Sequence, residues 1–228
     1  MNFNFDNLST TNFASDSKKY LKPYEIYEVS LTKFEPSTLK GSKDPNATYP
    51  VVSLEFSGED GVFSQNIFIP VTDTDFERRE NPSSHKAMPS RFEQYQFTLM
   101  QIVKAINPAG EEKIKANASK IKTVDQFTEL VAKALAGKEN VKVFLKLVGQ
   151  NSNGTTYARL PNACLIGNDG KPAPLNFISA DEDKLYFSSY EMTQMKAYKN
   201  AKPTNMDKVD ADTGTKTSDD IDLDDIDL

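Results

Sequence analysis

The sequence predicts an α+β domain that is mainly β. Apolar and polar residues alternate in five separate stretches between residues 24 and 160, which is the period of half-buried strands. Between the third and fourth of these stretches, residues 90–106 and 123–136 instead place apolar residues at helical intervals. At 228 residues, the chain is long enough for one such domain with appendages.

The first three strands are expected close together in the sequence. Residues 24–34 alternate between apolar and polar, whereas residues 35–50 are rich in turn-forming residues and are expected to form a long loop. A second strand follows around 52–56 and a third at 62–69. The sequence Gly-Glu-Asp-Gly at 58–61 joins them in a turn short enough to make the two strands antiparallel.

Two helices are expected between the third and fourth strands. Ser90 and Glu93 have the spacing of a capping box at the start of the first helix, which Pro108 ends. Thr123 begins the second helix and Gly137 ends it. The helical insert is therefore bounded by ordinary start and stop residues.

A fourth strand at 141–148 and a fifth at 155–160 are joined by a turn rich in Asn and Gly. Three antiparallel strands, a helical segment and two more strands is the order of the five-stranded OB barrel. The sequence thus predicts an OB-like barrel with a helical insert between strands 3 and 4. Any small antiparallel β domain with such an insert is the alternative. In the extension that follows we expect two short strands and a closing helix, at 175–178, 185–187 and 189–199.

The two ends of the chain differ from the domain expected at 23–200. Residues 1–22 are rich in Asn, Ser, Thr and Lys and are expected to form a flexible arm. Residues 201–228 are expected to be a disordered linker and acidic tail, since 207–228 contain nine Asp and only two Lys. Residues 207–228 carry a net charge of −7, whereas the whole chain carries −6, so the remainder of the chain is close to neutral. A near-neutral body can still bind a polyanion if its basic residues share one face.

The chain ends in the pentad Asp-Asp-Ile-Asp-Leu, written twice. Its six Asp repel one another and its four aliphatic side chains bury too little area to fold alone. A purely solubilising tail is the alternative, but such a tail has no use for Ile and Leu at fixed spacing. We interpret the repeat as a tip that docks in a basic pocket with an apolar floor. Its residues are Asp219, Asp220, Ile221, Asp222, Leu223, Asp224, Asp225, Ile226, Asp227 and Leu228.

The residue types give little support to catalysis, a metal site or a cofactor. His85 is the only histidine and Cys164 the only cysteine, which excludes a zinc site built from several Cys and His and any intramolecular disulfide. A nucleophilic pair of these two residues is the alternative, but Cys164 lies in an apolar run that is expected to be buried. The glycine motifs of Walker and dinucleotide sites are missing. We therefore expect a protein that is not an enzyme and that uses no metal or cofactor.

The chain carries no pattern typical of membrane proteins or secretion. Its first residues lack the basic and apolar regions of a secretory signal, and no stretch approaches the roughly 18 apolar residues of a membrane span. We expect a cytoplasmic protein without membrane contact.

An aromatic and cationic surface is expected on the fourth and fifth strands. Alternation places the apolar residues of 141–148 in the core, so the residues between them should point to solvent. If the fifth strand pairs with the fourth, the outward residues form one patch of Lys142, Phe144, Lys146, Tyr157 and Arg159. Single-stranded nucleic acid binds such surfaces, because bases stack on rings for about 1–3 kcal/mol each while cations follow the phosphates. The alternative is that Phe144 is covered by residues 161–200 or by a dimer partner.

The third strand and the loops extend this surface. Phe68 points away from the core side of its strand and is expected to extend the stacking platform. A single exposed Lys or Arg is usually just a solvated surface charge. Only a position on the loops at the rim of an OB groove favours a role in binding phosphate. The expected phosphate contacts are Lys33, Lys40, Lys43, Arg78 and Arg79.

These features resemble the single-stranded DNA-binding proteins of bacteria and, more closely in layout, those of bacteriophages. The resemblance covers the strand order of 24–160 and, more sharply, the tail at 207–228. It implies a sequence-tolerant single-stranded DNA-binding protein of replication and recombination, in the host cytoplasm if phage-encoded. In that family the tail recruits replication and recombination proteins and competes with DNA for the basic groove. Bacterial tails end in Pro-Phe, whereas this chain ends in Leu228, which leaves the docking partner open.

Two other functions remain open at this point. A structural or adaptor protein of a phage particle or assembly would place Phe144 in a subunit interface. An RNA-binding or strand-annealing protein would use the same surface as a DNA-binding one. The possibility of a homo-oligomer is compatible with each of these functions.

Overall fold

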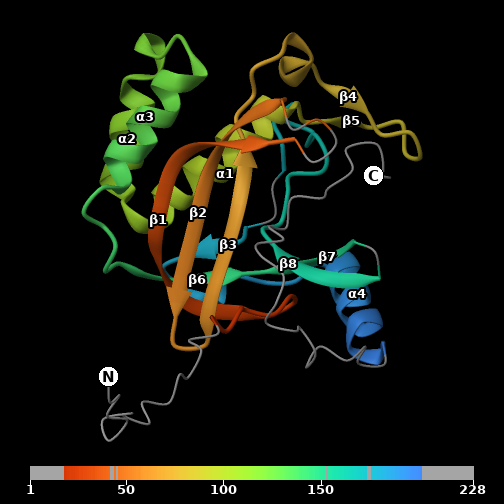
Figure 1. Ribbon diagram of the computed structural model, residues 1–228. Helices are drawn as coiled ribbons and strands as arrows, with labels where there is room; N and C mark the ends of the chain where they lie inside the picture. Colours follow the sequence, from red (N-terminus) through yellow and green to blue (C-terminus); the bar gives the residue numbers. More distant parts are fainter. Residues whose placement is uncertain (1–17, 42–43, 45, 153, 174–175, 202–228) are drawn as a thin grey trace, which may run out of the picture.

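The computed structural model describes residues 18–41, 44, 46–152, 154–173 and 176–201. Within these residues the fold is α+β, with a mainly antiparallel sheet of five strands and four α-helices (Figure 1). The strands and helices are β1 (Ile26–Lys40), β2 (Thr48–Gly58), β3 (Gly61–Phe68), β4 (Arg79–Glu80), β5 (Ala87–Met88), α1 (Arg91–Ile106), α2 (Pro108–Ala116), α3 (Val124–Leu135), β6 (Lys142–Lys146), β7 (Val148–Ser152), β8 (Thr155–Arg159), β9 (Ile178–Ser179) and α4 (Ser189–Asn200).

The main sheet has the strand order β3-β2-β1-β6-β9. The predicted antiparallel hairpin of β2 and β3 is confirmed, with Gly58 opposite Gly61. Gly61 has a φ of +143°, and a Cβ there would lie 2.2 Å from the carbonyl oxygen of Lys19, so the turn needs glycine. Helices α1, α2 and α3 lie to one side of the curved sheet, whereas α4 lies beside β7 and β8 (Figure 1).

The long loop predicted for 35–50 is wrong in most of its length. Strand β1 continues to Lys40 and β2 already begins at Thr48, so only a short connection separates them. Pro36 did not stop the strand because β1 pairs with β6 only from Ile26 to Ser30. Beyond Ser30 the other side of β1 is an edge, where a missing N–H is tolerated.

The two predicted helices are confirmed together with their caps. Ser90 accepts a hydrogen bond from the Glu93 N–H while the Glu93 carboxylate accepts one from the Ser90 N–H, which completes the capping box of α1. Thr123 caps α3 through the Gln126 N–H. Helix α2 was missed: Pro108 ends α1, but it also occupies the first turn of a new helix, where its lack of an N–H costs nothing.

The core lies between the sheet and the insert. Leu99, Ile102 and Val103 of α1 are fully buried and belong to one apolar cluster with Leu54 and Phe56 of β2. Their spacing places them on one side of α1, as the sequence predicted. Burial of this side attaches the insert to the sheet.

A pair of buried hydroxyl groups joins α1 to α3. The Tyr95 and Thr128 oxygens lie 2.7 Å apart, and Thr128 Oγ1 also donates to the Val124 carbonyl at 2.8 Å. Burial raises the pKa of Tyr95 to about 12.

Replacing Thr128 with Val is expected to lower the free energy of unfolding by about 1–3 kcal/mol, because the buried Tyr95 hydroxyl loses its partner. Urea denaturation measures this loss. Tyr95→Phe added to Thr128→Val should cost less than the sum of the single changes, since no hydroxyl is then orphaned. Strict additivity would contradict the contact.

No closed barrel forms among the described residues, so the predicted OB-like barrel is not confirmed. The predicted fourth strand is divided into β6 and β7, and β7 pairs with β8 in a separate two-stranded sheet. The division occurs at Leu147, whose N–H and carbonyl bond to Glu25 and Tyr24. A Cβ at Gly149 would lie 2.5 Å from the Tyr24 ring, so the strand bends past this ring.

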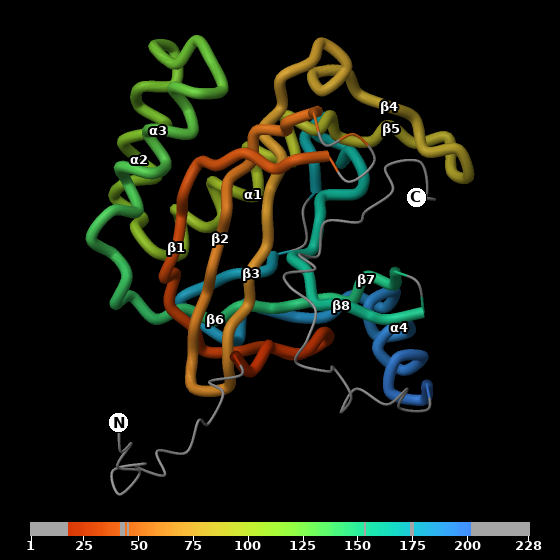
Figure 2. The backbone as a smooth tube through the Cα atoms, viewed as in Figure 1, coloured from red at the N-terminus to blue at the C-terminus, as the bar shows by residue number. Residues whose placement is uncertain are grey.

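The extension after β8 is only partly as predicted. Ile178–Ser179 forms the short strand β9 on β6, and α4 begins at the capping box of Ser188 and Glu191. Residues 185–187 form no strand, and Leu175 lies outside the described residues. In Figure 2 the segment after β8 runs beside β3 toward β4 and β5, where Ile166 donates to the Ala87 carbonyl. None of the helices in the described part of the chain is long and apolar enough to span a membrane.

Candidate nucleic-acid interface

Two aromatic rings lie on the outer face of the main sheet. Phe68 ends β3 and is 46% exposed, as the alternation predicted, while Phe63 on the other face is buried. Tyr49 of β2 is 42% exposed, and its ring meets that of Phe68 edge to face with 6.2 Å between centroids. Exposed rings side by side on a strand face provide a surface on which planar groups can stack.

Next to the rings this face carries Val51, which lies opposite Phe68 and is fully buried, and further along it is polar rather than cationic. Ser53 donates to Asn66 at 2.8 Å across β2 and β3. Glu55 accepts from Ser64 at 3.3 Å and pairs with Lys18 at 3.2 Å. The rings therefore lie at the end of a face whose middle is already hydrogen-bonded.

The predicted rim cations differ in whether they already form an ion pair. Lys40 is exposed at the end of β1 and has no ion pair with another described residue, and the same holds for Arg79 of β4. Lys33 pairs with Glu35 at 3.2 Å. Lys43 lies outside the described residues. Lys40 is thus a rim cation without an ion pair next to Tyr49 in the strand pairing, although its partner Thr48 places it on the other face of the sheet.

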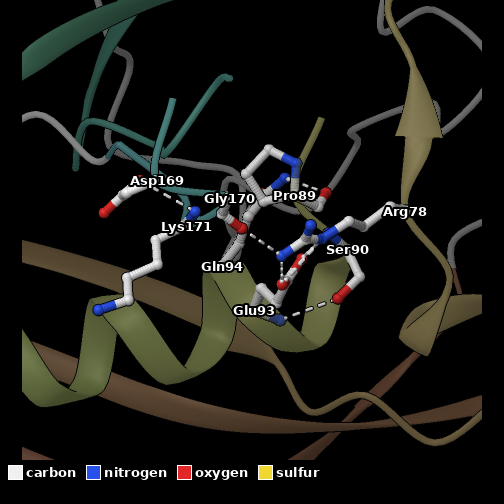
Figure 3. Close-up of polar contacts among 8 residues, drawn as sticks. All are labelled: Arg78, Pro89, Ser90, Glu93, Gln94, Asp169, Gly170 and Lys171. Carbon is white, nitrogen blue, oxygen red and sulfur yellow. Dashed lines mark hydrogen bonds and ion pairs between the residues drawn. The ribbon is translucent and has the colours of Figure 1, made fainter. Parts of the chain in front are cut away.

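Arg78 is committed to a structural contact. Its guanidinium donates to both carboxylate oxygens of Glu93 and, at 2.9 Å, to the Gly170 carbonyl (Figure 3). The guanidinium lowers the pKa of Glu93, which also closes the capping box of α1. Arg78 therefore holds the polar segment before α1 to the loop at 167–171, and it fits a phosphate contact poorly.

The predicted solvent-facing surface of β6 is mostly covered. Lys142 is exposed but pairs with Glu28 on β1 at 3.0 Å. Phe144 is half-buried between β1 and β9, where it lies opposite Glu28 and Ser179. The alternative that residues 161–200 cover this strand is therefore correct for part of it.

Lys146 is 0% exposed, so its predicted position in solvent is wrong. Its ammonium donates to the Tyr186 carbonyl at 2.8 Å and to both oxygens of Glu191 at 3.1 Å. It also lies 5.4 Å from the centre of the Phe187 ring. Burial lowers the pKa of Lys146, while Glu191 raises it. The parity prediction was correct, but the chain folds back over this side of the strand and supplies a counter-charge.

Tyr157 and Arg159 remain accessible on β8. Tyr157 is 51% exposed. The Arg159 guanidinium is half-buried and donates only to neutral oxygens, of Gln150 and Leu160, both at 3.3 Å. Burial lowers its pKa, and it has no acidic partner in the described part of the chain. A half-buried guanidinium of this kind is suited to accept an anion.

These two residues lie next to β3 rather than β6. The expected pairing of the fifth strand with the strand of Phe144 is wrong, since Tyr157 lies opposite Gln150 of β7. The Leu160 N–H instead donates to the Gln65 side chain of β3 at 2.9 Å. The candidate interface therefore has two parts: Tyr49 and Phe68 on the outer face of β2 and β3, with Lys40 at the end of β1, and Tyr157 and Arg159 on β8, whose end meets β3 at Gln65 on the other face.

Tyr49 was missed, although the sequence contains the necessary information. The two-residue turn between Gly58 and Gly61 sets the register of β2 and β3. Counting back along both strands places Val51 opposite Phe68. Tyr49 follows two residues further on the same face, so it could have been predicted as a diagonal neighbour.

The cysteine and the histidine do not come together in an obvious site. Cys164 is exposed, so its expected burial is wrong. His85 has a φ of +52° and lies 2.6 Å from Glu80 through Nδ1. Among the described residues, no group of three or more His, Cys, Asp and Glu side chains is arranged to hold a metal ion.

The predicted docking tip, Asp219–Leu228, lies outside the described residues. The candidate interface thus rests on the strands alone, with aromatic rings and cations contributed by β1, β2, β3 and β8. Comparison of the chain with known proteins finds no matching family model, no matching curated protein and no matching solved structure.

Proposed function

We propose that this protein is a non-catalytic, sequence-tolerant single-stranded DNA-binding protein of the bacteriophage type. It protects the strand and recruits replication or recombination proteins through its acidic tail. The observation that carries the proposal is the exposed pair of Tyr49 and Phe68 on the outer face of the sheet. Stacked bases would cover these rings, and Lys40 and Arg159 are the cations without an acidic partner that remain available to the backbone.

Single strands fit this surface better than a duplex does. A base can stack on an aromatic ring only when its face is free, which requires an unpaired or splayed strand. Duplex readers instead insert a helix or ribbon into a groove. The outer face of a sheet with rings near its end is not such an element, so single-stranded DNA is the favoured ligand.

We propose further that the domain is an OB-like fold that is open rather than closed. The strand order β3-β2-β1-β6, with helices between β3 and β6, supports this relationship. So does the bond from Leu160 to Gln65, which brings β8 to the edge of β3. In OB folds the face of the second and third strands binds oligonucleotides, and Tyr49 and Phe68 lie on the corresponding strands here.

Oligo-dT is expected to bind more tightly than a duplex of equal length in a gel shift. The logarithm of its binding constant should fall with the logarithm of salt concentration by about 0.7 per phosphate neutralised. Equal binding of the duplex would contradict a stacking surface. Preference for oligo-U over oligo-dT would identify an RNA-binding protein instead.

A structural or adaptor protein is the second candidate. It is favoured by an apolar groove on the helical insert, which is separate from the strand face. Absence of binding to every nucleic acid in the gel shift would support this candidate and overturn the first.

A further inference from the structure

Helices α1, α2 and α3 surround a large open groove together with the segment that follows β3. The groove has a volume of about 930 Å³. Two of its apolar residues, Val71 and Phe76, are exposed, and the Phe76 ring packs 5.0 Å from that of Phe92 between centroids. Other apolar residues of its floor are Phe97, Met100, Ile114, Ile121, Val124 and Phe127.

Helix α1 is apolar on two sides, which a helix covering only one core does not need. One side is buried against the sheet by residues such as Leu99 and Ile102. Phe92, Phe97 and Met100 instead line the groove and are only half-buried. Contiguous exposed apolar area of this kind marks a surface that binds another chain.

A polar group in the groove also lacks a partner. The side-chain oxygen of Gln101 is buried and has no hydrogen bond to any described residue. Such atoms are rare in folded proteins and call for a partner.

The rim of the groove is cationic where it is not already neutralised. Lys104 of α1 and Lys122 before α3 have no acidic partner within the described chain. Lys115 pairs with Glu111 at 2.8 Å, so these two charges offset each other. Asp125 is the remaining acidic residue of the lining. Unpaired lysines over an apolar floor suit a peptide that alternates acidic and aliphatic residues.

We propose that this groove binds the chain's own C-terminal repeat, Asp219–Leu228. Its four aliphatic residues would contact the floor while its six Asp meet the lysines of the rim. Residues 202–218 can span up to about 55–60 Å, which exceeds the diameter of about 40 Å of a domain of this size. Covalent attachment also gives the tip a high effective concentration at the groove.

This proposal goes beyond DNA binding and does not depend on it. It also differs from the competition with DNA that the family resemblance implies. The strand face is less cationic than the sequence predicted, because Lys146 is buried and Lys142 is paired with Glu28. The groove of the insert combines the two properties that the repeat requires.

The test places the photoreactive residue p-benzoylphenylalanine at position 76 of the full chain, without DNA. Irradiation followed by peptide mass spectrometry should find crosslinks to residues 219–228. Phe76 is about half exposed, so the change should not affect folding. A control chain carries the photoreactive residue at position 68 instead, because Phe68 is an equally exposed ring on the outer face of the sheet.

Crosslinks to the tail from position 68 instead of position 76 would show that the tail covers the strand face, and would overturn the proposal. Crosslinks from neither position would also overturn it. Mixing isotopically heavy and light chains shows whether the crosslinked tail belongs to the same chain or to another copy. Crosslinks between a heavy and a light chain would contradict docking within one chain. The gel shift with oligo-dT tests DNA binding separately, so the two proposals can fail independently.

Tail variants test the chemistry of docking. One variant combines Ile221→Ser, Leu223→Ser, Ile226→Ser and Leu228→Ser and keeps all six Asp of the repeat. The other replaces these six Asp with Asn and keeps the four aliphatic residues. Both variants should lose the crosslink from position 76, and high salt should weaken it in the parent. The methyl resonance of Met100 should shift in the serine variant, while that of Met192 on α4 stays unchanged. An unchanged Met100 resonance would contradict docking even if the position 76 protein failed to fold.

Discussion

Glu191→Gln is expected to lower the free energy of unfolding by about 3 kcal/mol, because it leaves the ammonium of Lys146 buried without a counter-charge. Lys146 is fully buried and Glu191 nearly so, and both oxygens of the carboxylate lie 3.1 Å from the ammonium. Glutamine can still close the capping box with Ser188, so the change removes the charge and keeps the cap. Thermal or urea denaturation at pH 7 measures the loss.

The loss should become smaller at alkaline pH. Burial holds the pKa of Lys146 below the 10.5 of an unfolded chain, and removal of Glu191 lowers it further because Glu191 raises it. Between the folded and unfolded pKa values the unfolded chain binds more protons, so the free energy of unfolding rises with pH. The pH range between the folded and unfolded pKa values of Lys146 is wider in the variant than in the parent. The difference in free energy of unfolding between variant and parent should therefore shrink as the pH approaches 10.5.

Glu93→Gln is the matched control, since Glu93 closes the same kind of capping box on α1. Its partner Arg78 is exposed to solvent, so the loss should be much smaller. Adding Lys146→Met to Glu191→Gln removes the buried charge and should restore most of the stability. Equal losses for the two Gln variants would contradict a buried ion pair.

Phe68→Ala and Tyr157→Ala are each expected to weaken binding of oligo-dT by about 1–3 kcal/mol, which is roughly 5- to 150-fold. Each change removes an exposed ring from a strand face, and neither ring is part of the core. The loss should be similar for different base sequences, because every base has a face that can stack. Fluorescence anisotropy at constant salt measures the affinity.

Tyr190→Ala is the control for a ring that is exposed elsewhere, on α4. It should bind like the parent. If Phe68→Ala and Tyr157→Ala also bind like the parent, the stacking surface is not where we propose it. Loss of affinity for Phe68→Ala alone would restrict the interface to β2 and β3.

The local structure could be predicted because its causes are local. Alternation placed the apolar residues of β2, β3 and β6 in the core, and the capping box at Ser90 and the N-cap at Thr123 located two helices. The short turn at Gly58 correctly predicted an antiparallel hairpin. The missed helix α2 shows the limit of such rules, since Pro108 both ends one helix and begins another.

The sequence by itself therefore determined most of the strands and two of the helices, the parity of those strands, and the separation of an acidic tail from a near-neutral body. The tertiary structure decided which outward faces stay open. Lys146 and Phe68 have equivalent outward positions on their strands, yet residues 186–191 bury the first and leave the second exposed. That difference arises from a contact between segments 40 residues apart, which the period of a single strand cannot report.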